Sequence, residues 1–302
     1  MIQPTNRLPI THSSFPDFLA ACRETLDRLV QVGVGWKGTR FDMYKRTVEE
    51  MAELSYPRAV NLENKDEREK DRFFREAASQ FSQLNVSTAL WEKQDQAVLA
   101  SKLKDVVSGT AMPAKGKDWD PSRNALAELA TGSLLERRGF LVTLTSAKED
   151  LIARSPSLGE FAVEVKRPAS EESIENNLKR LRSQLKQRCK RPGCMGLAVV
   201  AIDRIVSLAG SMARSQTEFE FRSTLDRTME EQTVKLRTLV QRRDLRLFPT
   251  TPFVAALLVG TVFVDDLGMP VQIGMLSMRS TASLDAMDQE RVDRMQRQLS
   301  TF

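Results

Sequence analysis

The sequence contains a single histidine, His12, and three cysteines, Cys22, Cys189 and Cys194. A Ser-His-Asp or Cys-His mechanism would have to use His12, so we do not expect nucleophilic hydrolase chemistry of that kind. The cysteines form no CxxC pair, and no histidine lies near Cys189 and Cys194 to complete a zinc site. We therefore expect free thiols in a reducing compartment.

Long hydrophobic runs are also lacking. The longest, FVAALLVGTVFV at residues 253–264, is too short to span a bilayer, which needs about 20 residues. The first residues, MIQPTNRLPITHSS, have no apolar core of the kind found in signal peptides. With 41% hydrophobic and 28% charged residues, the composition is that of a globular protein. We expect a soluble, cytoplasmic protein with no membrane partner.

The charge is mildly basic, and one segment divides the chain. A net charge of +5 is compatible with a nucleic-acid partner but is weak evidence alone. The segment SGTAMPAKGKDWDPS is rich in glycine, proline and small residues, which predicts a domain boundary near residue 115. We expect a helical N-terminal domain of unknown role at residues 1–115. Residues 116–302, which carry most of the basic excess, form the second predicted domain.

The spacing of apolar residues predicts helices throughout the first part of the chain. The motif GVGWKG, at residues 33–38, matches GxGxxG, but an amphipathic helix precedes it where a nucleotide-binding motif needs a strand. We therefore expect no dinucleotide cofactor there, and we interpret Gly33 as the end of a helix. The predicted helices cover residues 14–32, 41–54, 61–84 and 94–107.

After residue 120, helices and strands alternate, which predicts an α/β domain with a mixed sheet flanked by helices. Asp120 followed by Pro121 is a good helix start, and Ser170 is the expected N-cap of a later helix. Predicted helices cover residues 121–138, 171–189, 216–243 and 284–299. Predicted strands cover residues 140–145, 150–154, 160–166, 196–202, 252–264 and 271–278.

The stretch DLIARSPSLGEFAVEVK, residues 150–166, places acids and a lysine on two neighbouring strands. Its central residues, SPSLG, are good turn formers, so the flanking segments should form a hairpin. If the turn is centred on Ser157, the numbers of paired residues sum to 314, and Asp150 lies opposite Glu164. Directly opposed residues share a face, with Cβ atoms about 5 Å apart. Lys166 follows on the same face.

Two opposed carboxylates repel each other unless a positive charge lies between them, and divalent metals prefer carboxylate oxygens. A metal held by Asp150 and Glu164 would lower the pKa of a bound water and neutralise developing charge. Lys166, beside the metal, could orient that water. The pattern therefore favours metal-assisted hydrolysis of a phosphodiester.

These residues resemble a known family. Asp150 followed by Glu164-Val165-Lys166 is similar to the D…(D/E)xK motif of the PD-(D/E)xK nuclease superfamily, although Glu149 stands where the motif's name has proline. The resemblance covers roughly residues 123–203. It implies a restriction-endonuclease-like core, nucleic-acid cleavage and dependence on Mg²⁺, with Mn²⁺ able to substitute.

The resemblance also implies roles for single residues. The family carries a glutamate on the helix before the motif and often a glutamine on the helix after it, and here Glu128 and Gln184 are the best matches. Glu128 would hold a second metal or a metal-bound water, and Gln184 with Arg167 would steady the phosphate. The implied Mg²⁺ ligands are Asp150, Glu164, Glu128 and the carbonyl of Val165.

A basic segment follows the motif. Residues 179–191, KRLRSQLKQRCKR, contain seven basic residues and no acid. Beside a metal site, such a helix can track the phosphates of a nucleic acid, through Lys179, Arg182 and Lys186. The alternative is a solvated helix face without a ligand.

We predict a Mg²⁺-dependent nuclease, with DNA as the favoured substrate and a homodimer as the expected form for cutting two strands. One alternative is a nucleic-acid-binding module that keeps the scaffold without catalysis. Another is an interaction factor whose residues 1–115 recruit a protein partner.

Overall fold

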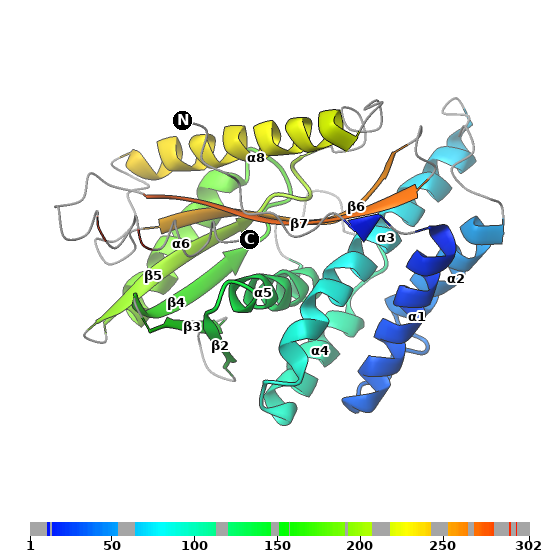
Figure 1. The fold of residues 1–302 in the computed structure, drawn as a ribbon, viewed down its shortest axis with the longest axis horizontal. Helices are drawn as coiled ribbons and strands as arrows, with labels where there is room; N and C mark the ends of the chain where they lie inside the picture. The colour runs from blue at the N-terminus through cyan, green and yellow to red at the C-terminus, as the bar shows by residue number, and fades with distance from the viewer. Residues whose placement is uncertain are drawn as a thin grey trace.

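A computed structural model describes residues 11–12, 14–53, 64–112, 120–145, 151–156, 158–190, 193–206, 218–242, 253–264, 269–280, 290 and 294 (Figure 1). The helices are α1 (Phe15–Gln31), α2 (Arg40–Glu53), α3 (Lys65–Trp91), α4 (Gln96–Ser108), α5 (Pro121–Glu136), α6 (Ile174–Arg188) and α8 (Glu218–Gln241). The strands are β1 (Thr11–His12), β2 (Leu141–Leu144), β3 (Leu151–Ser155), β4 (Gly159–Lys166), β5 (Cys194–Ala201), β6 (Phe253–Val264) and β7 (Met269–Ser280).

The strands form one mixed sheet in the order β1-β7-β6-β5-β4-β3-β2. The consecutive strands β2, β3 and β4 are antiparallel, as short turns require. β4, β5 and β6 are parallel, and helices α6 and α8 make the crossovers. This arrangement confirms the predicted α/β class.

Helices cover both faces of the sheet (Figure 1). On one face, α6 and α8 pack on a cluster that includes Ala162 and Ala198. On the other face, residues from α1 to α5 share a single hydrophobic cluster with Phe161, Val163 and Val199. The helices on both sides of residue 115 therefore contribute to one core. The division of the chain at that residue stays a prediction, and residues 113–119 lie outside the described part.

Local signals set most of the helix ends. The side chain of Asp120 accepts a hydrogen bond from the backbone N–H of Arg123, and Pro121 is the first residue of α5, as predicted. Gly33 and Gly139 have φ values of 79° and 78° just after α1 and α5, a conformation that favours glycine. α3 continues to Trp91, seven residues beyond the predicted end at residue 84.

The start of α6 differs from the prediction. Ser170 does not cap the helix, because the segment 170–173 forms a turn in which the hydroxyl of Ser173 donates to the carbonyl of Ser170 over 2.9 Å. The helix begins four residues later, at Ile174. The predicted helix at residues 284–299 lies outside the described part except for Glu290 and Arg294.

The three cysteines form no disulfide, as predicted, and the structure shows that all three are buried. Burial raises the pKa of the Cys22 thiol well above its usual value, which makes it unreactive. Within the described residues, no helix is both long enough and apolar enough to cross a membrane.

Candidate active site

The β3–β4 hairpin has the register that the sequence predicted. Leu151 pairs with Val163, Ala153 with Phe161, and Ser155 with Gly159, so that the paired numbers sum to 314. Asp150 immediately precedes β3 but lies outside the described residues. The predicted pairing of Asp150 with Glu164 therefore stays a prediction.

Side chains of β4 alternate between the two faces of the sheet. Val163 and Val165 belong to the cluster on the side of α1 to α5, whereas Ala162 belongs to the cluster under α6 and α8. Glu164 and Lys166 share the face of Ala162, so they point toward α6. The acid and the lysine thus lie between the sheet and a helix.

Glu164 is completely buried, with an exposed fraction of 0%, and Lys166 is nearly so. The Nζ atom of Lys166 lies 3.6 Å from Oε2 of Glu164. The same ammonium group donates a hydrogen bond to the carbonyl of Val165 over 3.1 Å. Lys166 therefore contacts both of the described groups that were predicted to hold a metal on β4.

A second cation contacts the acid, and sequence reasoning missed it. Arg188, the last residue of α6, forms an ion pair with Glu164, and its side chain is only 9% exposed. Arg188 lies four residues after Gln184 and therefore on the same face of the helix. That spacing within KRLRSQLKQRCKR was the signal that could have identified it.

The remaining residues of α6 divide between the interior and the solvent. Leu178, Leu181 and Leu185 are buried against the sheet. Gln184 is half-buried, and its Oε1 atom has no hydrogen-bond partner within the described part of the chain. The predicted phosphate-binding residues on this helix, Lys179, Arg182 and Lys186, are all exposed.

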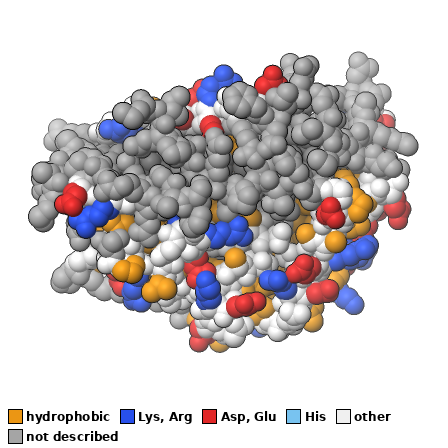
Figure 2. All heavy atoms as spheres, viewed as in Figure 1, with side chains coloured by type: hydrophobic (Ala, Val, Ile, Leu, Met, Phe, Trp, Pro, Cys, Tyr) orange, Lys and Arg blue, Asp and Glu red, His pale blue; other side chains and the backbone are white. Residues whose placement is uncertain are grey.

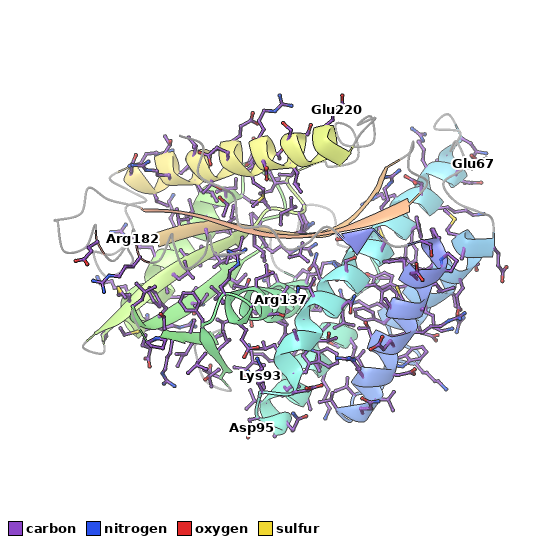
Figure 3. All side chains as sticks on the ribbon, viewed as in Figure 1. Glu67, Lys93, Asp95, Arg137, Arg182 and Glu220 are labelled. Atoms are coloured by element: carbon purple, nitrogen blue, oxygen red, sulfur yellow. The ribbon has the colours of Figure 1, made fainter. Side chains whose placement is uncertain are left out.

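Figure 3 shows Arg182 at the periphery of the molecule, away from the helices α1 to α4. These exposed cations form a basic row on the outside of α6, which we define as Lys179, Arg180, Arg182, Lys186 and Lys190. By contrast, the described surface over α1 and α4 carries interspersed charges of both signs (Figure 2).

Two predicted site residues lie elsewhere. Glu128 is on α5, which packs on the opposite face of the sheet from Glu164, and it forms an ion pair with Lys102 over 2.6 Å. The structure therefore does not bring Glu128 to Glu164, and the second-metal role of Glu128 stays a prediction. Glu128 is separated from Glu164 because α5 and α6 cover different faces of the sheet. The spacing of residues along the sequence could not reveal which face each helix covers.

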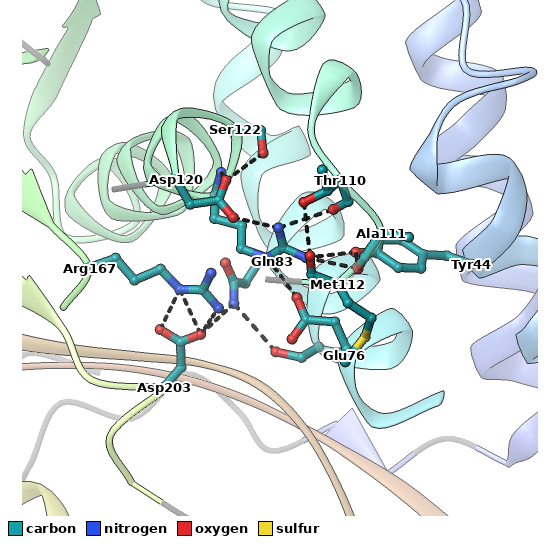
Figure 4. A network of polar contacts seen from close by, with 12 residues as sticks. Tyr44, Glu76, Gln83, Thr110, Ala111, Met112, Asp120, Ser122, Arg167 and Asp203 are labelled. Atoms are coloured by element: carbon teal, nitrogen blue, oxygen red, sulfur yellow. Dashed lines mark hydrogen bonds and ion pairs between the residues drawn. The ribbon is translucent and has the colours of Figure 1, made fainter. Parts of the chain in front are cut away.

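Arg167 also lies on the far side, because it follows Lys166 and points toward α3. It is buried, and its Nε atom donates to Oδ1 of Asp203 over 2.9 Å (Figure 4). Burial alone would lower the pKa of Arg167, but the carboxylate of Asp203 raises it above its usual value. The predicted contact between Arg167 and phosphate is replaced here by a structural ion pair.

Glu164 is the described carboxylate on β4 that was predicted to hold a metal. Neither oxygen of Glu164 accepts a hydrogen bond of normal geometry from the residues that the structure describes. A buried carboxylate in that state can still accept a hard cation. The described residues contain no group of three or more metal-ligating acids, cysteines or histidines. Asp150, the second predicted carboxylate ligand, lies outside the described residues, so the Mg²⁺ site stays a prediction.

Comparisons of the chain with protein-family models, with curated proteins and with solved structures gave no match.

Proposed function

We propose that this protein is a metal-dependent nuclease that hydrolyses phosphodiester bonds, with DNA as the favoured substrate. The observation that carries the proposal is the register of the β3–β4 hairpin, which is the register that the predicted pairing of Asp150 with Glu164 requires. Lys166, 3.6 Å from Glu164, supplies the cation that such a site needs. The resemblance to PD-(D/E)xK nucleases rests on these same residues.

The order of elements around the motif supports a restriction-endonuclease-like core. α5 precedes β2, β3 carries the position after Asp150, and β4 carries Glu164 and Lys166. α6 follows with Gln184, and β5 is an apolar strand parallel to β4. This is the sequence of elements in which the family pattern places its motif.

Each residue has a chemical role in this proposal. Mg²⁺, when bound, would lower the pKa of a water and neutralise charge on the phosphate. Asp150 and Glu164 would supply carboxylate oxygens, and the carbonyl of Val165 would add a neutral one. Lys166 would hold the attacking water by a hydrogen bond and stabilise charge on a phosphate oxygen. The basic row on α6 would position the nucleic-acid backbone.

The test is a cleavage assay with wild type and Lys166→Ala. Supercoiled and linear duplex DNA, single-stranded DNA and RNA would each be incubated with Mg²⁺, with Mn²⁺ and with EDTA. We expect metal-dependent cutting by the wild type and a loss of about 10²–10³-fold in Lys166→Ala. Lys93→Ala, at an exposed position far from α6, is the control and should cut at the wild-type rate. Full activity of Lys166→Ala would rule out the assigned role.

A second candidate is a nucleic-acid-binding module without catalysis. The complete burial of Glu164 between Lys166 and Arg188 favours it, because an acid matched by two cations also serves as a structural cluster. This candidate predicts binding that weakens with salt through the basic row, that EDTA does not change, and that persists in Lys166→Ala.

A further inference from the structure

We infer that Arg188 and the catalytic metal compete for Glu164, so that binding of metal and of nucleic acid are coupled through this arginine. The inference rests on the proposed function, since it concerns the same carboxylate. It adds Arg188, a residue that the motif does not contain.

The first step is the burial of the acid. A buried carboxylate is costly unless a cation accompanies it, and Glu164 has an exposed fraction of 0%. Arg188 reaches it from the end of α6, whereas Lys166 lies on the same strand as the acid. Both contacts supply countercharge to the buried carboxylate.

The second step is a count of charges. Glu164, Lys166 and Arg188 together carry a net charge of +1. Adding a divalent cation while Arg188 stays in place would raise this to +3 among side chains that are almost completely buried. Like charges at such short range repel strongly. The dication and the guanidinium therefore exclude each other from Glu164.

The third step is where Arg188 goes. It is the last residue of α6, and the exposed residue Lys190 follows two positions later. A change of rotamer there can carry a long side chain outward without moving the helix. A guanidinium outside the site adds to the basic row, and its planar donors suit phosphate oxygens. Nucleic acid would thus stabilise the displaced arginine, while the metal takes the carboxylate.

This arrangement predicts positive coupling, because each ligand removes the obstacle to the other. Metal alone must displace Arg188 without compensation, so its affinity for the free protein is low. Nucleic acid supplies a partner for Arg188, so metal then binds more tightly. The coupling must be reciprocal for the two affinities.

The experiment measures Mn²⁺ affinity by electron paramagnetic resonance, with no cleavage required. Wild type, Arg188→Gln and the matched control Arg68→Gln, an exposed arginine on α3 outside the basic row, would be titrated with and without a phosphorothioate-linked DNA oligonucleotide. We expect Arg188→Gln to bind Mn²⁺ about tenfold tighter than wild type without DNA, which corresponds to a coupling of typical size. DNA should raise the Mn²⁺ affinity of wild type and of Arg68→Gln, and should change that of Arg188→Gln little.

Folding is controlled separately. Arg188→Gln leaves a buried acid, so its melting temperature without metal should fall, and Mn²⁺ should raise it by more than in wild type. The double variant Glu164→Gln with Arg188→Gln removes both charges and should fold without binding Mn²⁺ at this site.

If wild type and Arg188→Gln have equal Mn²⁺ affinities and the protein cleaves with metal, Arg188 does not compete with the metal for Glu164. The proposed nuclease function would still stand. Failure of both proteins to bind Mn²⁺, with or without DNA, would overturn the competition and the proposed function together. Weaker binding by Arg188→Gln would instead make the arginine a support of the site, again against the inference.

Discussion

Gln83, in the middle of α3, donates a hydrogen bond to the carboxylate of Asp203 at the end of β5, over 3.3 Å from Nε2 to Oδ2 (Figure 4). The same amide group donates to the carbonyl of Val259 over 3.1 Å. Asp203 in turn forms an ion pair with Arg167, the residue after Lys166. α3 is therefore tied to the end of the strand that carries the candidate site.

Replacing Gln83 by Leu should destabilise the protein by about 1–3 kcal/mol, since buried acceptors lose their donor. The measurement is urea denaturation at neutral pH. Gln31→Leu, at an exposed position, provides the comparison and should change the free energy of unfolding little. Equal stability of the two variants would show that the hydrogen bonds of Gln83 contribute nothing to the free energy of unfolding.

Asp203→Leu should cost about 3–5 kcal/mol, because it leaves the buried guanidinium of Arg167 without its carboxylate. The double variant Arg167→Met with Asp203→Leu removes both charges and should recover most of that loss. Denaturation of the wild type, both single variants and the double variant completes a double-mutant cycle. Additive losses would contradict the pairing.

The stability contributed by Asp120 should depend on pH. Burial raises the pKa of its carboxyl, but Arg123, 2.6 Å away, outweighs this and holds the pKa below the usual value. The ionised form thus stabilises the folded state above the unfolded-state pKa of about 3.9, and that stability is lost as the pH falls through the lower folded-state pKa.

Asp120→Asn should therefore lower the free energy of unfolding by about 1–2 kcal/mol at pH 7, with the difference shrinking below about pH 4. Urea denaturation across pH 3–7 would measure it, with the exposed Asp105→Asn as control. A difference that stays constant down to pH 3 would contradict the ion pair as its source.

Replacing Arg40, in contrast to the residues above, should increase the free energy of unfolding. Arg40 is 2% exposed and lies over the ring of Phe41, and among the described residues none of its three guanidinium nitrogens has a hydrogen-bond partner. Burial lowers the pKa of Arg40 to about 10. Arg40→Met, which keeps an unbranched apolar side chain without the charge, should stabilise the protein by about 1–3 kcal/mol.

The pH dependence follows the same logic. Because the folded state disfavours the charged form of Arg40, wild-type stability should rise as the pH increases above about 10, and this rise should be absent in Arg40→Met. Thermal denaturation of both proteins between about pH 9 and pH 12 measures it. A lower melting temperature for Arg40→Met at pH 7 would show that the arginine has a stabilising role.

Local chemistry was sufficient to predict several features. The two-residue alternation of EFAVEVK and the turn residues SPSLG determined the register of the β3–β4 hairpin, because a slip of one residue would turn every side chain to the other face. Asp120 and Pro121 determined the start of α5, since capping depends on neighbours within one turn. Glu164 and Lys166 could be assigned to one face for the same reason.

The tertiary structure decided which helix met which face of the sheet. The sequence suggested Glu128, Arg167 and Gln184 as residues of one site. In the structure, α5 carries Glu128 on one face of the sheet, whereas α6 packs on the other face, beside Glu164. The tertiary structure also brought Arg188 to that acid, 24 positions along the chain, and joined Arg167 to Asp203. These contacts depend on how buried surfaces from distant segments fit together, and the periodicity of a single segment carries no information about its partner.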